Sequence, residues 1–193
     1  MRRVLSVAIA VVSLVVGAGL GGKARGVGQV EPAQEAKSTK APGTLRVAGR
    51  GLKAIELSMS DFRAMPRRTV TVKDKDGKPL VYDGVLAQHV LSKAGLDFGQ
   101  GMLGPRLRDY LLAEASDGYA VVFALPELSA EFSDRAVLVA DTCNDKPLTE
   151  KDGPFKIIVS DERKHSRWVR NLTSLTVHTC EKEQSAPGAA TEK

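Results

Sequence analysis

The chain has 193 residues, of which 42% are hydrophobic and 26% charged, which is typical of one globular domain with flanking segments. The formal charge is +5, but Arg2, Arg3, Lys23 and Arg25 lie near the N-terminus, and without them it falls to +1. A chain this close to neutral gives no electrostatic case for binding nucleic acid or an anionic membrane surface.

Residues 1–25 have the pattern of a signal peptide. Two arginines precede an apolar run from Val4 to Leu20, and small residues follow this run. We expect cleavage between Ala18 and Val30, and therefore a periplasmic or secreted protein with no membrane span after cleavage. The alternative is an uncleaved anchor, because a run of about 17 apolar residues is at the short limit for a spanning helix.

The folded domain is predicted to occupy residues 44–180. Residues 26–43 are polar, contain Ala, Lys, Glu, Gln and Pro, and lack an apolar period, so they are predicted to form a flexible linker. Residues 181–193 have a similar composition and are predicted to form a disordered tail.

Short strands dominate the first half of this domain. We expect them at residues 44–48, 55–57, 69–72 and 80–82, where β-branched and apolar residues gather. Asp76-Gly77 is a turn that joins the last two strands into a hairpin. Ser60 is expected to cap a short helix that Pro66 ends, and Asp83-Gly84 to break a strand before a second helix at residues 85–94.

The stretch Leu111–Phe123 is predicted to be a hairpin at the centre of a sheet. Both arms are apolar, and Ser116-Asp117-Gly118 forms the turn between them. After it we expect a short helix at 125–128, strands at 136–140, 155–159 and 168–177, and a charged loop at 160–167. The fold class is therefore α+β, mostly β, with a mixed sheet and a few short helices.

Five stretches carry a resemblance to a known family. In chain order they are LSMSDFRAMPRRTVTV, YDGVLAQHVLSKAGL, ASDGYAVVFALPEL, NDKPLTEKDGPFKIIVS and RWVRNLTSLTV, and together they span nearly all of residues 45–177. Their order resembles the molybdopterin-binding oxidoreductase domain, which has the sulfite-oxidase fold. The resemblance implies a compact exported domain related to one that holds a pyranopterin molybdenum cofactor in a cleft.

The chain departs from the family at the metal ligand. In catalytic members a cysteine just after the strand equivalent to Thr69–Val72 binds molybdenum, whereas this chain has Lys73-Asp74-Lys75-Asp76 there. Molybdenum at such a site needs a soft thiolate, which lysine and aspartate do not provide. The resemblance covers the molybdopterin-binding domain alone, so we expect no counterpart of the second, dimerising domain of the larger sulfite oxidases in residues 44–180.

We therefore expect a binding or accessory module that performs no redox chemistry and holds no cofactor. Its partner would be a small anionic ligand or an exported protein. The alternative is an active molybdopterin-dependent oxidoreductase that holds its cofactor without a cysteine ligand. A third interpretation is a purely structural subunit of an exported complex.

Asp117, Gly118 and Tyr119 form the first candidate cofactor- or ligand-binding group. Glycine lets a ligand approach the backbone, while tyrosine offers an aromatic face and a hydroxyl. The alternative is an ordinary hairpin turn with a half-buried tyrosine. Trp168, further along the chain, is expected in the core.

Arg163, His165 and Arg167, together with Lys164, form the second candidate group. Arginine binds phosphate or carboxylate through two parallel hydrogen bonds, and the resemblance places this loop near the cofactor. The alternative is a solvated charged loop.

The two cysteines, Cys143 and Cys180, are candidates for a disulfide in an oxidising compartment. The alternative is two separate thiols. His89 is expected to be a partly exposed structural histidine. His178 and Cys180 supply only half of a metal site, because no second ligand pair has zinc spacing.

Overall fold

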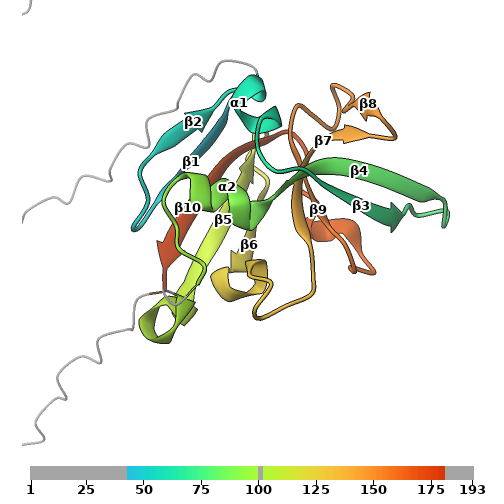
Figure 1. The fold of residues 1–193 in the computed structure, drawn as a ribbon. Coiled ribbons are helices and arrows are strands. Elements are labelled where there is room, and N and C mark those ends of the chain that lie inside the picture. Colours follow the sequence, from blue (N-terminus) through green and yellow to red (C-terminus); the bar gives the residue numbers. More distant parts are fainter. Residues whose placement is uncertain (1–42, 100–101, 181–193) are drawn as a thin grey trace, which may run out of the picture. The chain divides into compact units, whose positions relative to one another are not determined.

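The computed structural model describes residues 43–99 and 102–180, all of which belong to the compact unit Thr39–Lys193 (Figure 1). The predicted signal peptide, residues 26–42 of the predicted linker, and the tail at 181–193 lie outside the described residues. Within the part described, no helix has both the length and the apolar character needed to cross a membrane.

One five-stranded sheet joins the two ends of the domain. It contains β1 (Leu45–Gly49), β2 (Ile55–Leu57), β5 (Asp109–Ala115), β6 (Ala120–Ala124) and β10 (Leu172–Thr179), in the order β2-β1-β10-β5-β6. The first and last strands, β1 and β10, pair in parallel, whereas the other pairs are antiparallel. The mixed sheet predicted from the sequence is therefore confirmed.

The second sheet is built around β7. Its strands are β3 (Arg68–Lys73), β4 (Pro79–Leu86), β7 (Val137–Cys143), β8 (Lys146–Pro147) and β9 (Lys156–Val159). All pairs are antiparallel, and β7 pairs with β4, β8 and β9 (Figure 1). All four residues of β9 are buried, so this short strand belongs to the core.

The helices are few and short, as expected for an α+β domain that is mostly β. They are α1 (Met59–Arg63), α2 (Ala87–Lys93) and the 3-10 turns η2 (Gly104–Arg108), η3 (Leu125–Leu128) and η4 (His165–Arg167). Ser58 rather than Ser60 caps α1, because its hydroxyl accepts from the Asp61 N–H while the Asp61 carboxylate accepts from the Ser58 N–H.

Asp83-Gly84 does not break the strand as the sequence suggested. β4 continues to Leu86, and the register with β7 shifts between Asp83 and Gly84 as in a β-bulge. A Cβ at Gly84 would overlap the Val139 carbonyl, so glycine is needed for close backbone approach rather than for a turn. The predicted helix consequently starts at Ala87.

The β5–β6 hairpin lies at the edge of its sheet rather than at the centre. β5 is an inner strand with alternating burial, while β6 is the last strand in the order and Val122 is 51% exposed. Because both strands are rich in apolar residues, the sequence did not distinguish the inner strand β5 from the edge strand β6. The core itself contains side chains of both sheets and includes an edge-to-face contact between Phe62 and Phe155, whose ring centres are 4.9 Å apart.

Candidate functional site

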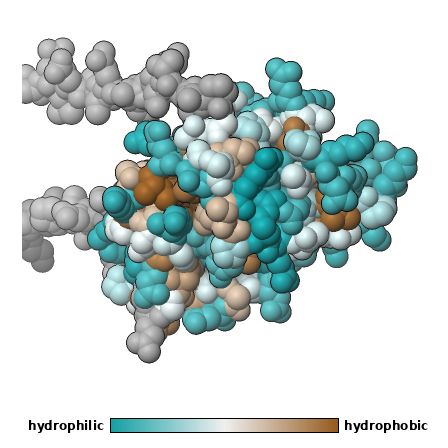
Figure 2. Space-filling view, turned by 45° about the horizontal axis from the view of Figure 1, so that its top comes forward, coloured by the Kyte–Doolittle hydropathy of each residue, from teal (hydrophilic) through white to brown (hydrophobic). Residues whose placement is uncertain are grey.

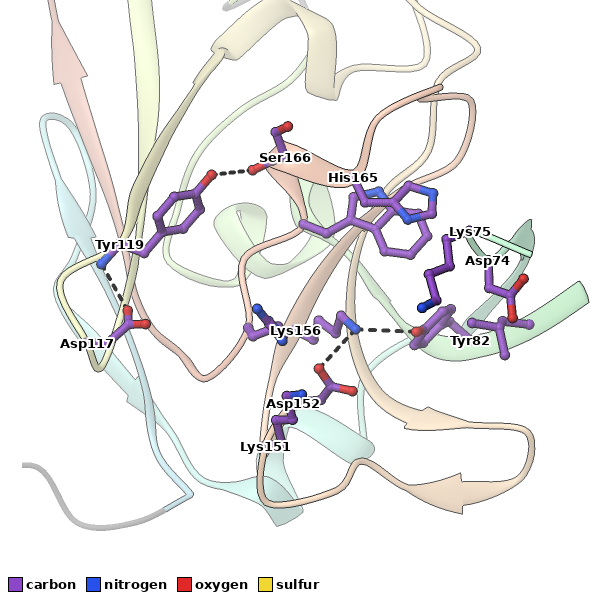
Figure 3. A pocket seen from close by; sticks show the side chains of 13 residues that line it. Asp74, Lys75, Tyr82, Asp117, Tyr119, Lys151, Asp152, Lys156, His165 and Ser166 are labelled. Atoms are coloured by element: carbon purple, nitrogen blue, oxygen red, sulfur yellow. Dashed lines mark hydrogen bonds and ion pairs between the residues drawn. The ribbon is translucent and has the colours of Figure 1, made fainter. Parts of the chain in front are cut away.

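A pocket of about 790 Å³ lies between the turns of the two sheets (Figure 3). Its lining combines aromatic, basic and acidic side chains: Asp74, Lys75, Leu80, Tyr82, Asp117, Tyr119, Lys151, Asp152, Lys156, His165, Ser166, Trp168 and Arg170. This volume is in the range of sites that bind small organic molecules.

Five segments far apart in the sequence contribute to the pocket. The β3–β4 turn, β4, the β5–β6 turn, the segment from residue 151 into β9, and the segment from η4 to residue 170 all reach it. Backbone hydrogen bonds from Ile157 to Val169 and from Leu172 to Phe155 hold the last two segments side by side. This pairing places Trp168 close to Lys156.

Lys156 is the buried charge of the pocket, with a relative exposure of 7%. Its ammonium group lies 3.2 Å from Asp152 Oδ1 and 3.4 Å from the Tyr82 hydroxyl. It also lies 5.4 Å from the centre of the Tyr82 ring and 5.8 Å from that of Trp168, within the range of cation–π attraction. Figure 3 shows it between Asp152 and Tyr82.

Trp168 and His165 form a stacked pair. Their ring centres are 3.6 Å apart and the planes differ by 11°. Trp168 is buried, as predicted, but it belongs to the pocket as well as to the core. Its Nε1 is closed to solvent and has no hydrogen-bond partner, an arrangement that costs about 1–3 kcal/mol.

Tyr82 completes the aromatic wall. Its ring meets Trp168 edge-on, with the ring centres 5.9 Å apart. Burial raises the pKa of the Tyr82 phenol, and the neighbouring Cys143 and Asp152 raise it further. The hydroxyl is therefore a neutral hydrogen-bonding group throughout the physiological pH range.

The hairpin turn contributes two of its three predicted residues to the pocket. Asp117 and Tyr119 line it, and Gly118 occupies the tip with a φ of +87°. The Asp117 carboxylate accepts from the Tyr119 N–H at 3.0 Å, while the Tyr119 hydroxyl donates to the Ser166 carbonyl (Figure 3). The turn is thus tied to η4, and both ends of this contact face the pocket.

The basic loop contributes differently from what the sequence suggested. His165 lines the pocket, whereas Arg163 and Arg167 do not. Arg167 pairs with Glu127 and Glu162, and its guanidinium lies 4.9 Å from the centre of the Phe123 ring. The Arg167 guanidinium, which was expected to bind an anionic ligand, therefore already forms ion pairs with two carboxylates of the protein itself.

Sequence reasoning missed Lys156, Tyr82 and Asp152. A signal for the first was present, because Lys156 interrupts an otherwise apolar segment, Phe155 to Val159, that was correctly predicted to be a strand. A lysine is almost never fully buried unless it has a partner. The partner, Asp152, is a turn residue whose approach to Lys156 depends on the tertiary fold.

The pocket does not supply the ligand that molybdenum needs from the protein. Asp74 and Lys75, at the position where the resemblance places a cysteine, line the pocket, and none of its described lining residues carries sulfur. Within residues 43–99 and 102–180, no group of three histidine, cysteine, aspartate or glutamate side chains is arranged to hold a metal. The described lining therefore does not provide the soft thiolate of the molybdenum centre that the resemblance implies.

Cys143 and Cys180 are free in the structure, so the candidate disulfide between them is not formed. Cys143 ends β7 in one sheet, whereas Cys180 follows β10 in the other. Cys143 lies opposite Tyr82 in the strand register without lining the pocket. His89 is partly buried, and its Nδ1 has no hydrogen-bond partner.

The fold alone places the domain in the sulfite-oxidase-like class of folds. Among the solved structures that match is the sulfane dehydrogenase SoxCD from Paracoccus pantotrophus, with a TM-score of 0.55 and 18% sequence identity. The alignment covers 70% of this chain and 38% of that chain, so the likeness shows the fold alone. No family model and no curated protein matches the chain.

Proposed function

We propose that this protein is an exported binding module that performs no redox chemistry and holds a small anionic molecule in the pocket. The pattern of residues 1–25 supports export. The pocket supports binding, since four lysine or arginine side chains line it against three aspartates. The domain would then present a ligand, or carry it to an exported partner protein.

Lys156 is the observation that carries this proposal. A buried ammonium group must be desolvated, and replacing a buried ion pair by apolar side chains is often neutral or stabilising. The fold therefore gains little from a lysine in β9. Among the described residues, Asp152 and Tyr82 accept hydrogen bonds from it, at 3.2 and 3.4 Å, which leaves one N–H of the ammonium for a ligand in the pocket.

Thermal unfolding in different sodium salts at constant ionic strength tests the proposal. We expect at least one of acetate, benzoate and phosphate to raise the melting temperature of the wild type, because a ligand that binds only the folded state stabilises it. Lys156→Met should lose this response, while Lys53→Met, at an exposed position outside the pocket, should keep it. Identical responses in all three proteins reject the proposal.

The second candidate function is a molybdopterin-dependent oxidoreductase that lacks a cysteine ligand. The structural likeness to a sulfane dehydrogenase favours it. The two functions differ in metal content when the protein is purified from a host supplied with molybdenum. We expect molybdenum far below one atom per chain, and a stoichiometric amount would establish the oxidoreductase instead.

A further inference from the structure

The size of the pocket limits what kind of anion it suits. At about 790 Å³ it lies in the upper part of the range for sites that enclose small organic molecules. A bare inorganic anion would leave most of this space to water. The pocket thus has room for an apolar body attached to the charged group.

The walls near Lys156 are three aromatic rings. Trp168 is stacked with His165 and makes an edge-to-face contact with Tyr82. Aromatic faces bury flat apolar groups by offset stacking and edge-to-face contact, each pair adding about 0.5–1.5 kcal/mol beyond the buried area. An unsaturated or aromatic body fits such walls better than a compact hydrated ion does.

The charges of the pocket lie at different depths. Lys156 is buried, whereas Lys75, Lys151 and Arg170 are exposed at the pocket opening. Asp152 already balances part of the Lys156 charge, so the inner end is suited to a single negative charge rather than to a phosphate dianion. A carboxylate there would accept a short charge-assisted hydrogen bond from the ammonium group.

We infer that the ligand is an aromatic monocarboxylate, with its carboxylate at Lys156 and its ring against Tyr82, Trp168 and His165. This inference rests on the proposed function and narrows it to one chemical class. In this arrangement Lys156 binds the negative charge of the ligand, and the aromatic side chains contact its apolar part. The exposed cations at the opening then draw the anion towards the pocket.

Isothermal titration calorimetry with four probes tests the inference. Benzoate has both features, benzamide keeps the ring and loses the charge, acetate keeps the charge and loses the ring, and inorganic phosphate lacks the ring. We expect benzoate to bind at least about tenfold more tightly than each of the others, a difference of about 1.4 kcal/mol. These comparisons use the wild-type chain and do not depend on the folding of any variant.

The variants locate the binding site. Lys156→Met should abolish the preference for benzoate over benzamide, while Lys53→Met should retain it. Trp168 is the single tryptophan of the chain, so benzoate should also change its fluorescence emission with the same saturation curve. A calorimetric signal without this optical change would place benzoate elsewhere and overturn the inference.

The outcomes separate this inference from the proposed function. If acetate or phosphate binds at the Lys156 pocket as tightly as benzoate, the inference that the ligand is aromatic is wrong, but the proposed anion binding is retained. If benzamide binds as tightly as benzoate, or if no probe gives saturable binding, the inference and anion binding both fail.

Discussion

At the scale of single residues, burial of Lys156 contributes little to folding stability, whereas the proposed ligand binding would account for it. It stands in a strand whose other three residues, Ile157, Ile158 and Val159, are fully buried and apolar. Its ammonium group lies among aromatic rings with one carboxylate partner. Residues that serve binding often reduce stability, so replacing this lysine should reveal a conflict between the two.

We predict that Lys156→Met leaves the free energy of unfolding unchanged or raises it. Methionine has a similar length, needs no desolvation of charge and packs well against aromatic rings, while the Asp152 side chain is 31% exposed and stays hydrated without its partner. Asp152→Ala should instead lower the free energy of unfolding, by about 1–3 kcal/mol, because it leaves a buried ammonium group without its carboxylate. Urea unfolding of the three proteins at pH 7 measures both values, and a large loss in Lys156→Met would show a structural lysine.

At the scale of elements, the bulge in β4 sets the register between β4 and β7, the two longest strands of the second sheet. Gly84 lies where β4 meets β7, and an added Cβ there would also come within 2.6 Å of the Ala140 Cα. We predict that Gly84→Ala destabilises the domain by about 3 kcal/mol or more, since backbone on both sides must move.

Gly118→Ala is the matched comparison for that variant. Its added Cβ meets nothing within 4 Å, so only the positive φ of +87° is unfavourable, at about 1–2 kcal/mol. Urea unfolding gives both losses. Equal losses would contradict the view that close packing, rather than backbone conformation, requires glycine in β4.

The elements were predictable wherever local chemistry decided them. The β-branched run Thr69–Val72 and the turn at Asp76-Gly77 gave the β3–β4 hairpin correctly, because neither depends on distant contacts. The same local reasoning mistook Gly84 for a break, since a bulge forms only against a partner strand. It also placed the β5–β6 hairpin at the centre of a sheet, because the exposure of β6 depends on the sheet order.

The site was predictable to a smaller degree for a related reason. Asp117, Tyr119 and His165, which were predicted from their turn and their charged loop because loops often carry function, line the pocket. Arg167 does not line the pocket but pairs with Glu127 and Glu162, which become its neighbours only in the folded chain. Tyr82 and Asp152 gave no local signal, as both are ordinary residues of a strand and a turn.

At the scale of the whole molecule, the pocket lies where turns of both sheets meet, so the described residues do not form a continuous apolar docking face there. Hydrophilic side chains cover most of the face in Figure 2, and hydrophobic ones form separate patches. Four of the exposed hydrophobic side chains lie at three places in the fold: Leu103 and Leu107 at η2, Val122 on β6, and Phe132 between η3 and β7. This scatter agrees with the proposed binding of a small molecule in the pocket, which needs no large apolar surface.

Tyr82 connects this pocket to the stability of the entire domain through pH. Because its pKa is raised in the folded protein, an unfolded chain releases the phenol proton first, near the ordinary tyrosine pKa of about 10. Above that pH the unfolded state binds fewer protons than the folded state, so the free energy of unfolding falls as the pH rises. This contribution is fully present below pH about 10 and is lost progressively above it.

We predict that Tyr82→Phe removes this part of the alkaline loss of stability. Urea unfolding from pH about 8 to about 11 should give a shallower decline for the variant than for the wild type, after their difference at pH about 8 is subtracted. The absorbance of tyrosinate offers an independent measurement, because the variant should lack the ionisation step that the wild type shows at the highest pH. Parallel stability curves for the two proteins would mean that Tyr82 ionises as freely in the folded domain as in the unfolded chain, and that the wall of the pocket is open to water.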